Sequence, residues 1–197
     1  PAEEKVAFAL EMERVAKAYD PRVTQVGYDT VLTGRASVRI VNTNGMDKRY
    51  AQSICGAYLQ PVAREGEHTA TGMDIQFARD FAALDAKRLG ETAAGRAVEM
   101  LGASPATSGQ YRVVIQNLAM VDLLETFAPA FSAENAQKAL SLLAGKVGET
   151  VAAPCVTIAD DPLRTDALAS RPFDAEGVPS RRNVVVGGGV FKTFLHN

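Results

Sequence analysis

The side chains most able to do chemistry in this sequence are scarce. Only two histidines are present, His68 and His196, and neither is placed so that a Ser-His-Asp or Cys-His arrangement can be argued. His68 follows Gly66-Glu67 at the start of a predicted strand, where a solvent-exposed histidine is expected rather than a metal ligand. His196 is expected to be poorly ordered. The sequence therefore predicts no catalytic residue and no metal ligand in this chain.

Three other patterns suggest chemistry but favour structural roles. Asp160-Asp161 could be paired catalytic carboxylates, yet before Pro162 such residues more often open a turn. The Gly187–Gly189 run could cradle a phosphate, but it lacks a following Lys-Ser/Thr pair and a helix, so a hairpin turn is predicted. Cys55 and Cys155 lie in apolar segments and are expected to be buried, reduced thiols, as in cytosolic proteins.

The composition is that of an ordinary globular protein with no basic character. The chain has 197 residues, 47% of them hydrophobic, and a formal net charge of -2. Arg181-Arg182 is a local basic pair, and a solvated loop is its simplest explanation, so no nucleic-acid partner is expected. No apolar run approaches the ~20 residues that span a bilayer, and the N-terminus lacks the layout of a signal peptide. We expect a cytoplasmic location and no membrane partner.

The first half of the chain predicts a helix-backed antiparallel β-meander. A helix is expected over residues 3–19, because apolar residues recur there at helical spacing. Alternating patterns predict strands over 22–32, 36–43, 48–63 and 68–77, with a type I′ turn at Asn44-Gly45. A second helix is expected over 85–101, with Leu89, Ala93, Ala97 and Leu101 on one apolar stripe and Gly102 as its C-terminal cap.

The second half mixes strands and helices. A short strand is predicted over 111–115, then a helix from about Leu118 that Pro129 interrupts, and a second helix from Ser132 through Leu143. A strand is expected over 152–158 and a closing hairpin over 183–187 and 190–195. The predicted class is α+β, in which the β-meander is followed by a strand–helix–helix segment and the start of a β-rich second domain. The polar connection 103–110 separates the predicted domains, 1–103 and 111–197.

Four segments of the second half form an ordered series of motifs: Gly145–Glu149, Val156–Pro162, Arg171–Arg182 with its Phe173-Asp174-x-Glu176-Gly177 core, and Gly189–Leu195. In this order they resemble the corresponding segments of the TldD/PmbA family of two-subunit metallopeptidases. Family members are longer at both ends, so the resemblance implies a central fragment, with the first domain truncated at its start and the second at its end.

The resemblance also allows a test for zinc. Zinc-bearing members carry an H-E-x-x-x-H motif on the helix after the short apolar strand, where two imidazoles hold the metal and the Glu acts as general base. The corresponding positions here are Glu125, Thr126 and Ala130. The chain therefore resembles the zinc-less PmbA/TldE-like branch, and we expect it to hold no cofactor, with zinc only in a TldD-type partner.

The resemblance implies a non-catalytic subunit of a complex that processes or degrades unfolded peptides and small proteins. Its partner would be a TldD-like zinc-bearing subunit or a second copy of itself, and the chain alone is expected not to be an active enzyme. The alternative is a stand-alone, homodimeric binding or scaffold protein without peptidase activity. Residues Arg171, Phe173, Asp174, Glu176, Gly177 and Arg181 are expected either to line a chamber or interface, or to form an internally salt-bridged loop.

Overall fold

The computed structural model describes residues 1–196, which form two compact units. The first unit contains Pro1–Thr107 together with Thr165–Val178, and the second contains Ser108–Arg164 and the chain from Pro179 onward. Helices and antiparallel sheets occur together, so the predicted α+β class is confirmed. Within the described residues, no helix is both long enough and apolar enough to cross a membrane.

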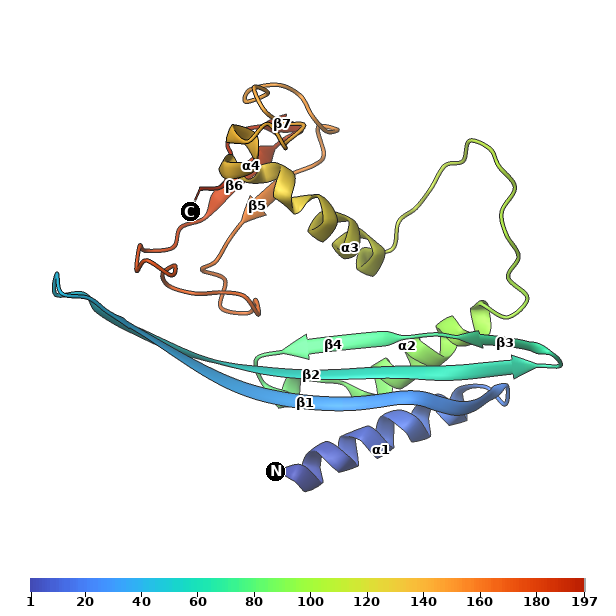
Figure 1. Ribbon diagram of the computed structural model, residues 1–197. Helices are drawn as coiled ribbons and strands as arrows, with labels where there is room; N and C mark the ends of the chain where they lie inside the picture. The colour runs from blue at the N-terminus through green and yellow to red at the C-terminus, as the bar shows by residue number, and fades with distance from the viewer. Residues whose placement is uncertain (197) are drawn as a thin grey trace. The chain divides into compact units, whose positions relative to one another are not determined.

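The sheet of the first unit is built around two long strands (Figure 1). β1 (Val23–Val41) pairs antiparallel with β2 (Asp47–Glu65) along its whole length, while β3 (His68–Thr71) and β4 (Asp74–Ala78) both pair with the other edge of β2. The prediction of four successive strands was wrong in two places. The expected strands 22–32 and 36–43 are one continuous strand, and the expected strand 68–77 is split into two.

The split between β3 and β4 has a steric cause at Gly72. Its amide donates to the carbonyl of Pro61, and a Cβ added there would lie 2.3 Å from both the carbonyl oxygen of Ala93 and the amide nitrogen of Ala97. Both atoms belong to α2 (Ala86–Glu99). The helix backbone therefore approaches the sheet so closely that only glycine fits at this position.

The turn between β1 and β2 also differs from the prediction. Gly45 has a φ of 84°, whereas Asn44 does not lie in the left-handed region, which a type I′ turn would require. The amide of Gly45 instead donates to the carbonyl of Asn42, and the side chain of Asn42 accepts from the amides of Asn44 and Met46. The asparagine that closes this longer turn is Asn42, two residues before the expected one.

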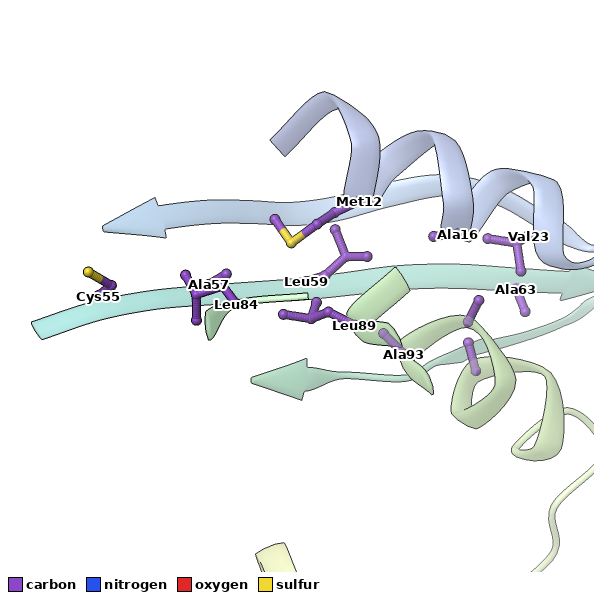
Figure 2. Packing of buried hydrophobic residues seen from close by; sticks show 12 residues of the cluster. Met12, Ala16, Val23, Cys55, Ala57, Leu59, Ala63, Leu84, Leu89 and Ala93 are labelled. Atoms are coloured by element: carbon purple, nitrogen blue, oxygen red, sulfur yellow. The ribbon is translucent and has the colours of Figure 1, made fainter. Parts of the chain in front are cut away.

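Two helices, α1 (Ala2–Tyr19) and α2, cover one face of this sheet. Leu89, Ala93 and Ala97 of α2 are fully buried, as their helical spacing predicted. Figure 2 shows Met12 of α1 and Leu89 of α2 converging on Leu59 of β2. The 3-10 turn η1 (Phe81–Ala83) leads into α2, whose first turn is capped by the Asp85 side chain. The core cluster comprises Met12, Ala16, Val23, Cys55, Ala57, Leu59, Ala63, Leu84, Leu89, Ala93, Ala94 and Ala97.

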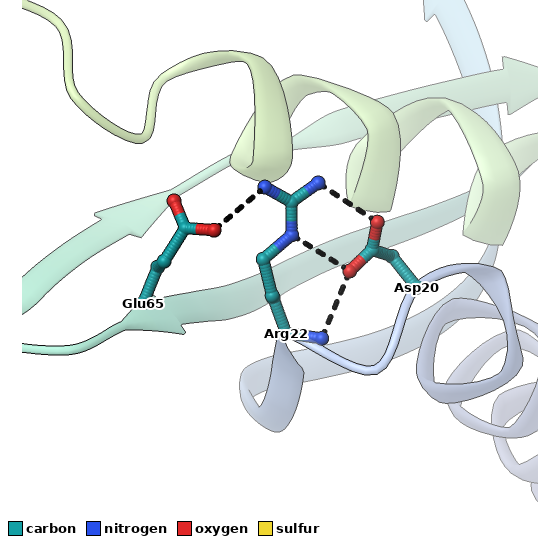
Figure 3. Close-up of polar contacts among 3 residues, drawn as sticks. All are labelled: Asp20, Arg22 and Glu65. Carbon is teal, nitrogen blue, oxygen red and sulfur yellow. Dashed lines mark hydrogen bonds and ion pairs between the residues drawn. The ribbon is translucent and has the colours of Figure 1, made fainter.

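An ion-pair cluster joins the end of α1 to the end of β2 (Figure 3). The Arg22 guanidinium donates to both carboxylate oxygens of Asp20 at 2.9 Å and to Glu65 at 3.3 Å. Hydrogen bonds from the Arg22 side chain and amide lower the pKa of Asp20 to about 2. Asp20 therefore stays ionised at any ordinary pH, and the cluster fixes the turn that aligns β1 with its helix.

The carboxylate of Asp29 in β1 lies in a partly buried position that disfavours its charged form. It lies opposite Leu59, on the face of the sheet that the helices cover, and its Oδ1 is buried without a hydrogen-bond partner among the described residues. Burial, and then the charge of Glu13 on α1, raises the pKa of Asp29 to about 6. Because the native state holds this proton more tightly than the unfolded chain, Asp29 reduces stability as the pH rises from about 4 through about 6.

We therefore expect Asp29→Asn to raise the free energy of unfolding by about 1–2 kcal/mol at pH 7 and to change it little near pH 4. Urea unfolding of both proteins across this pH range measures the difference. Glu67→Gln, an exposed substitution in the β2–β3 turn, serves as the control and should change neither value. If the free energy of unfolding of Asp29→Asn kept the pH dependence of the parent protein, Asp29 would not be the cause of that dependence.

The second unit has a small core around its closing hairpin. β5 (Ile158–Asp160), β6 (Asn183–Gly187) and β7 (Val190–Phe191) form an antiparallel sheet. Phe191 is fully buried and packs edge-to-face on Phe194, with ring centroids 4.8 Å apart. The helical elements are α3 (Asn117–Phe127), the 3-10 turn η2 (Ala128–Phe131) and α4 (Ala133–Gln137).

Several predicted elements of this unit were wrong. Residues 111–115 form no strand, because no strand in the described chain pairs with them, and Val114 is 99% exposed. The helix from Ser132 ends at Gln137 instead of Leu143, since Ala139 turns the chain with a φ of 56°. The expected strand 152–158 is replaced by β5, and β7 stops at Phe191 instead of Leu195. Cys155 is exposed, whereas Cys55 is buried as expected.

Candidate functional site

The β1–β2 hairpin continues beyond the helices, and we call residues 35–53 the distal arm. A hydrogen bond of 3.5 Å from Lys5 Nζ to Thr33 Oγ1 places the first turns of α1 just before this arm begins. Figure 1 shows both strands extending past the N-terminal end of α1. A two-stranded ribbon is only marginally stable by itself, so the arm needs support from another segment.

The segment Thr165–Val178 supplies that support and carries most of the sequence motif. Phe173 is only 5% exposed, and its ring packs edge-to-face on Tyr50 of β2 with centroids 5.2 Å apart. The ammonium of Lys48 lies 5.9 Å from the same ring centroid. The aromatic residue of the motif is therefore an anchor on the distal arm.

The residues after Phe173 form a tight turn that completes this docking. Asp174 Oδ1 accepts hydrogen bonds from the amides of Glu176 and Val178, each at 2.9 Å. Gly177 has a φ of 83°, and a Cβ there would lie 2.2 Å from the sulfur of Met46. Its carbonyl accepts a 2.7 Å hydrogen bond from Lys48 Nζ. Phe173, Asp174 and Gly177 thus build and seat a turn rather than supply reacting groups.

Arg79, just after β4, holds the start of the same segment. Its Nε and Nη2 donate to the carbonyl of Ala167 at 2.8 and 2.6 Å, and Nη2 also reaches the carbonyls of Leu168 and Ser170 at 3.4 Å. Sequence reasoning missed this role for Arg79. No local pattern signals it, because the partners are backbone carbonyls nearly ninety positions away.

The remaining charged residues of the motif are exposed. Arg171, Glu176 and Arg181 form no ion pair in the part of the chain that the structure describes, and neither does Asp174. These four residues therefore give no support to the expected alternative of an internally salt-bridged loop, which stays a prediction. The other expectation, that these residues line a chamber or interface, stays a prediction.

The positions that correspond to the zinc motif lie where a helix ends. Glu125 and Thr126 occupy the last turn of α3, while Ala130 lies in η2, beyond the break at Pro129. Thr126 Oγ1 donates to the carbonyl of Asp122 at 2.8 Å, and Glu125 is exposed. These side chains offer one carboxylate, one hydroxyl and one methyl group, which do not make a zinc site.

The other candidate groups remain separate from one another. His68 and His196 are both exposed, and within residues 1–196 no three His, Cys, Asp or Glu side chains lie close enough to hold a metal ion. Asp161 caps the turn at Leu163 and lies 3.4 Å from Arg182, so it acts structurally. Gly188 and Gly189 both have positive φ between β6 and β7, as a hairpin turn requires.

Comparison with known proteins places both halves of the chain in one family. Residues 1–101 match the PmbA/TldA metallopeptidase central domain, and residues 108–197 match the PmbA/TldA metallopeptidase C-terminal domain. A metalloprotease of Methanothermobacter thermautotrophicus is 30% identical over 203 residues, which cover 100% of this chain and 44% of the relative. The chain thus spans less than half the length of that relative.

A homologue named PmbA and a homologue named TldD are both similar to this chain. In Haemophilus influenzae, a metalloprotease PmbA homolog is 24% identical over 95% of this chain and 42% of its own length. A metalloprotease TldD homolog of the same organism is 27% identical over 99% of this chain and 42% of its own length. These identities differ too little to assign the chain to one branch.

Solved structures agree with the family assignment. A putative modulator of a DNA gyrase from Thermotoga maritima superposes with a TM-score of 0.94 at 37% identity, covering 100% of this chain and 46% of that one. TldE from Thermococcus kodakarensis superposes with a TM-score of 0.83 at 27% identity, covering 98% and 43%. From its sequence and from its fold alike, the chain belongs to the PmbA/TldD metallopeptidase family.

Proposed function

We propose that this chain is part of a non-catalytic, PmbA/TldE-like subunit of a two-subunit metallopeptidase that processes unfolded peptides and small proteins. The observation that carries the proposal is the set of residues at the end of α3. Where zinc-bearing members have H-E-x-x-x-H, this chain has Glu125, Thr126 and Ala130, and its two histidines lie elsewhere and exposed. Hydrolysis at neutral pH through a zinc-bound water needs the ligands that these positions lack.

In this proposal a TldD-like partner holds the zinc, and this chain helps to enclose and position the peptide. The assignment to the zinc-less branch rests on the missing ligands, since the chain is 27% identical both to TldE from Thermococcus kodakarensis and to a TldD homolog. A cytoplasmic location belongs to the same proposal. The name of the Thermotoga maritima protein refers to DNA gyrase, but the net charge of -2 in this chain gives no support for direct contact with DNA.

Association with the zinc-bearing subunit tests the proposal. The full-length protein that contains this chain is co-expressed with an untagged TldD-type subunit from the same genome and purified by its own tag. We expect a stable complex with one copy of each subunit, measured by light scattering. A homodimer that never takes up the second subunit would instead support the alternative, a stand-alone binding or scaffold protein.

Metal analysis of the same full-length protein, purified alone, separates these functions from an active metalloenzyme with unusual ligands. We expect far less than one zinc ion per chain, with no peptide cleavage. Stoichiometric zinc together with cleavage by the protein alone would contradict the non-catalytic assignment. The TldD-type subunit, analysed in parallel, is the positive control.

A further inference from the structure

The distal arm has a second face, opposite the one that carries Phe173. Side chains alternate between the faces of a strand, so Lys48 and Tyr50 point toward the docked segment while Arg49 points away from it. Arg39 lies directly across from Arg49, and Arg35 lies across from Ser53 on the same face. This second face therefore collects three arginines, beyond the region that the helices cover.

Within the part of the chain that the structure describes, one of these three guanidinium groups forms an ion pair with a carboxylate. Arg39 donates to Asp47 through Nε at 2.8 Å and through Nη2 at 2.6 Å, a bidentate pair. Arg35 and Arg49 are exposed and form no ion pair within the described residues. Like charges directly opposite each other on a sheet are unfavourable, and a single Asp47 neutralises only half of the Arg39–Arg49 pair.

A surface hollow of about 380 Å³ lies between these side chains and is lined by Arg39, Asp47 and Arg49. From it we propose that the arginine face of the distal arm binds a carboxylate group of a peptide, with Arg49 as its main donor and Arg39 beside it. The Arg39–Asp47 pair already displays the two-bond geometry that a guanidinium offers to a carboxylate. Arg49 offers the same planar donor set and forms no close ion pair within the described residues, although its charge also helps to lower the pKa of Asp47.

The opposite face of the arm anchors the backbone of this site. Phe173 packs on Tyr50, and the Lys48 ammonium donates to the carbonyl of Gly177, so both neighbours of Arg49 are held against the docked segment. A backbone held in place loses less conformational freedom on binding, which favours affinity. The docked segment thus supports the arm from the face opposite the arginines.

The size and charge of the face favour a carboxylate over nucleic acid. Binding of nucleic acid rests on many phosphate contacts at once, whereas this face has three guanidinium groups, one of them already neutralised, on a chain of net charge -2. The carboxylate can belong to an acidic side chain or to a peptide C-terminus. The choice of a peptide as the carrier of the carboxylate rests on the proposed function, but the test does not need the partner subunit, so the two can fail separately.

The test is an NMR titration of the arginine side-chain NH signals of the chain with short acetylated glycine peptides. One peptide carries a glutamate and an amidated C-terminus, a second has a free C-terminal carboxylate, and a third carries glutamine and an amidated C-terminus. We expect the Arg49 signal to shift with at least one of the carboxylate peptides and not with the third. Whichever carboxylate peptide binds identifies the source of the group.

Substitutions then locate the site. Arg49→Gln should weaken binding by about tenfold or more, and Arg49→Lys should bind with intermediate strength, because lysine keeps the charge but loses the bidentate fork. Arg64→Gln removes another exposed arginine from the same strand and should leave binding within about twofold of the unmodified chain.

Three results would overturn the proposal. The first is binding of the glutamine peptide as tightly as the carboxylate peptides. The second is the same loss of affinity in Arg49→Gln as in Arg64→Gln. The third is tighter binding of a single-stranded oligonucleotide than of either carboxylate peptide. The last result would assign the arginine face to nucleic acid. Amide exchange in the arm, measured on each variant, verifies that Arg49→Gln leaves the hairpin folded.

Discussion

Replacing Gly72 with alanine should destabilise the first unit by about 3 kcal/mol or more, since a buried overpacking change cannot be relieved cheaply. The new Cβ would lie 2.3 Å from two backbone atoms of α2, the Ala93 carbonyl oxygen and the Ala97 amide nitrogen. Neither atom can move without displacing the helix. Because α2 carries Leu89, Ala93 and Ala97 into the core, that displacement disrupts the packing of the whole sheet.

Urea unfolding followed by circular dichroism measures this effect. Gly27→Ala is the matched control, because Gly27 also lies in the sheet and a Cβ there would meet its nearest atom, the Gln60 carbonyl oxygen, at 3.5 Å, an ordinary contact. We expect the control to stay close to the parent protein in stability. If Gly72→Ala were as stable as Gly27→Ala, the close approach of α2 to the β3–β4 break would be wrong.

The second large effect is expected for Phe173→Ala, which should undock the segment Thr165–Val178 from the distal arm. Truncating a buried phenylalanine typically costs about 3–5 kcal/mol, and here the loss falls on local docking because the ring anchors a loop. Amide exchange in residues 173–178 and along the arm should accelerate by tenfold or more. A glutamate-specific endoproteinase should also cleave faster after Glu176, which is already exposed.

Phe77→Ala is the matched control for this experiment. Phe77 is also a phenylalanine of the first unit, but it is 45% exposed, so its truncation removes far less buried surface. We expect little change in exchange at residues 173–178 in this variant. Equal protection of that segment in Phe173→Ala and in the parent protein would contradict the assignment of Phe173 as its anchor.

The sequence predicted the elements of the first unit well where local pattern decided the outcome. The burial of Leu89, Ala93 and Ala97 followed from helical spacing. The break at Gly72 did not follow, because its cause is a helix that packs across it from a later part of the chain. Likewise, the run 111–115 reads as a strand, but a strand needs a paired edge, and the described residues offer none to it.

The candidate site was found only in part. The motif Phe173-Asp174-x-Glu176-Gly177 was singled out by its resemblance to the family, yet its mechanical role depends on partners that lie far away in the sequence. Lys48 is separated from Gly177 by 129 positions, and Arg79 from Ala167 by 88. Only the fold brings such partners together. The cross-strand register that pairs Arg39 with Arg49 likewise depended on the true length of the turn.

The central claim is that this chain belongs to a subunit that supports catalysis without performing it. The most direct test is cleavage of an unfolded peptide by the reconstituted two-subunit complex, with substitutions in each subunit in turn. We expect cleavage to require both subunits and to be abolished by replacing the H-E-x-x-x-H histidines of the partner. Replacing Glu125 with Gln and Thr126 with Ala in this chain should leave the rate unchanged. Cleavage that survives loss of the partner's histidines but is lost in the Glu125→Gln, Thr126→Ala protein would contradict the account.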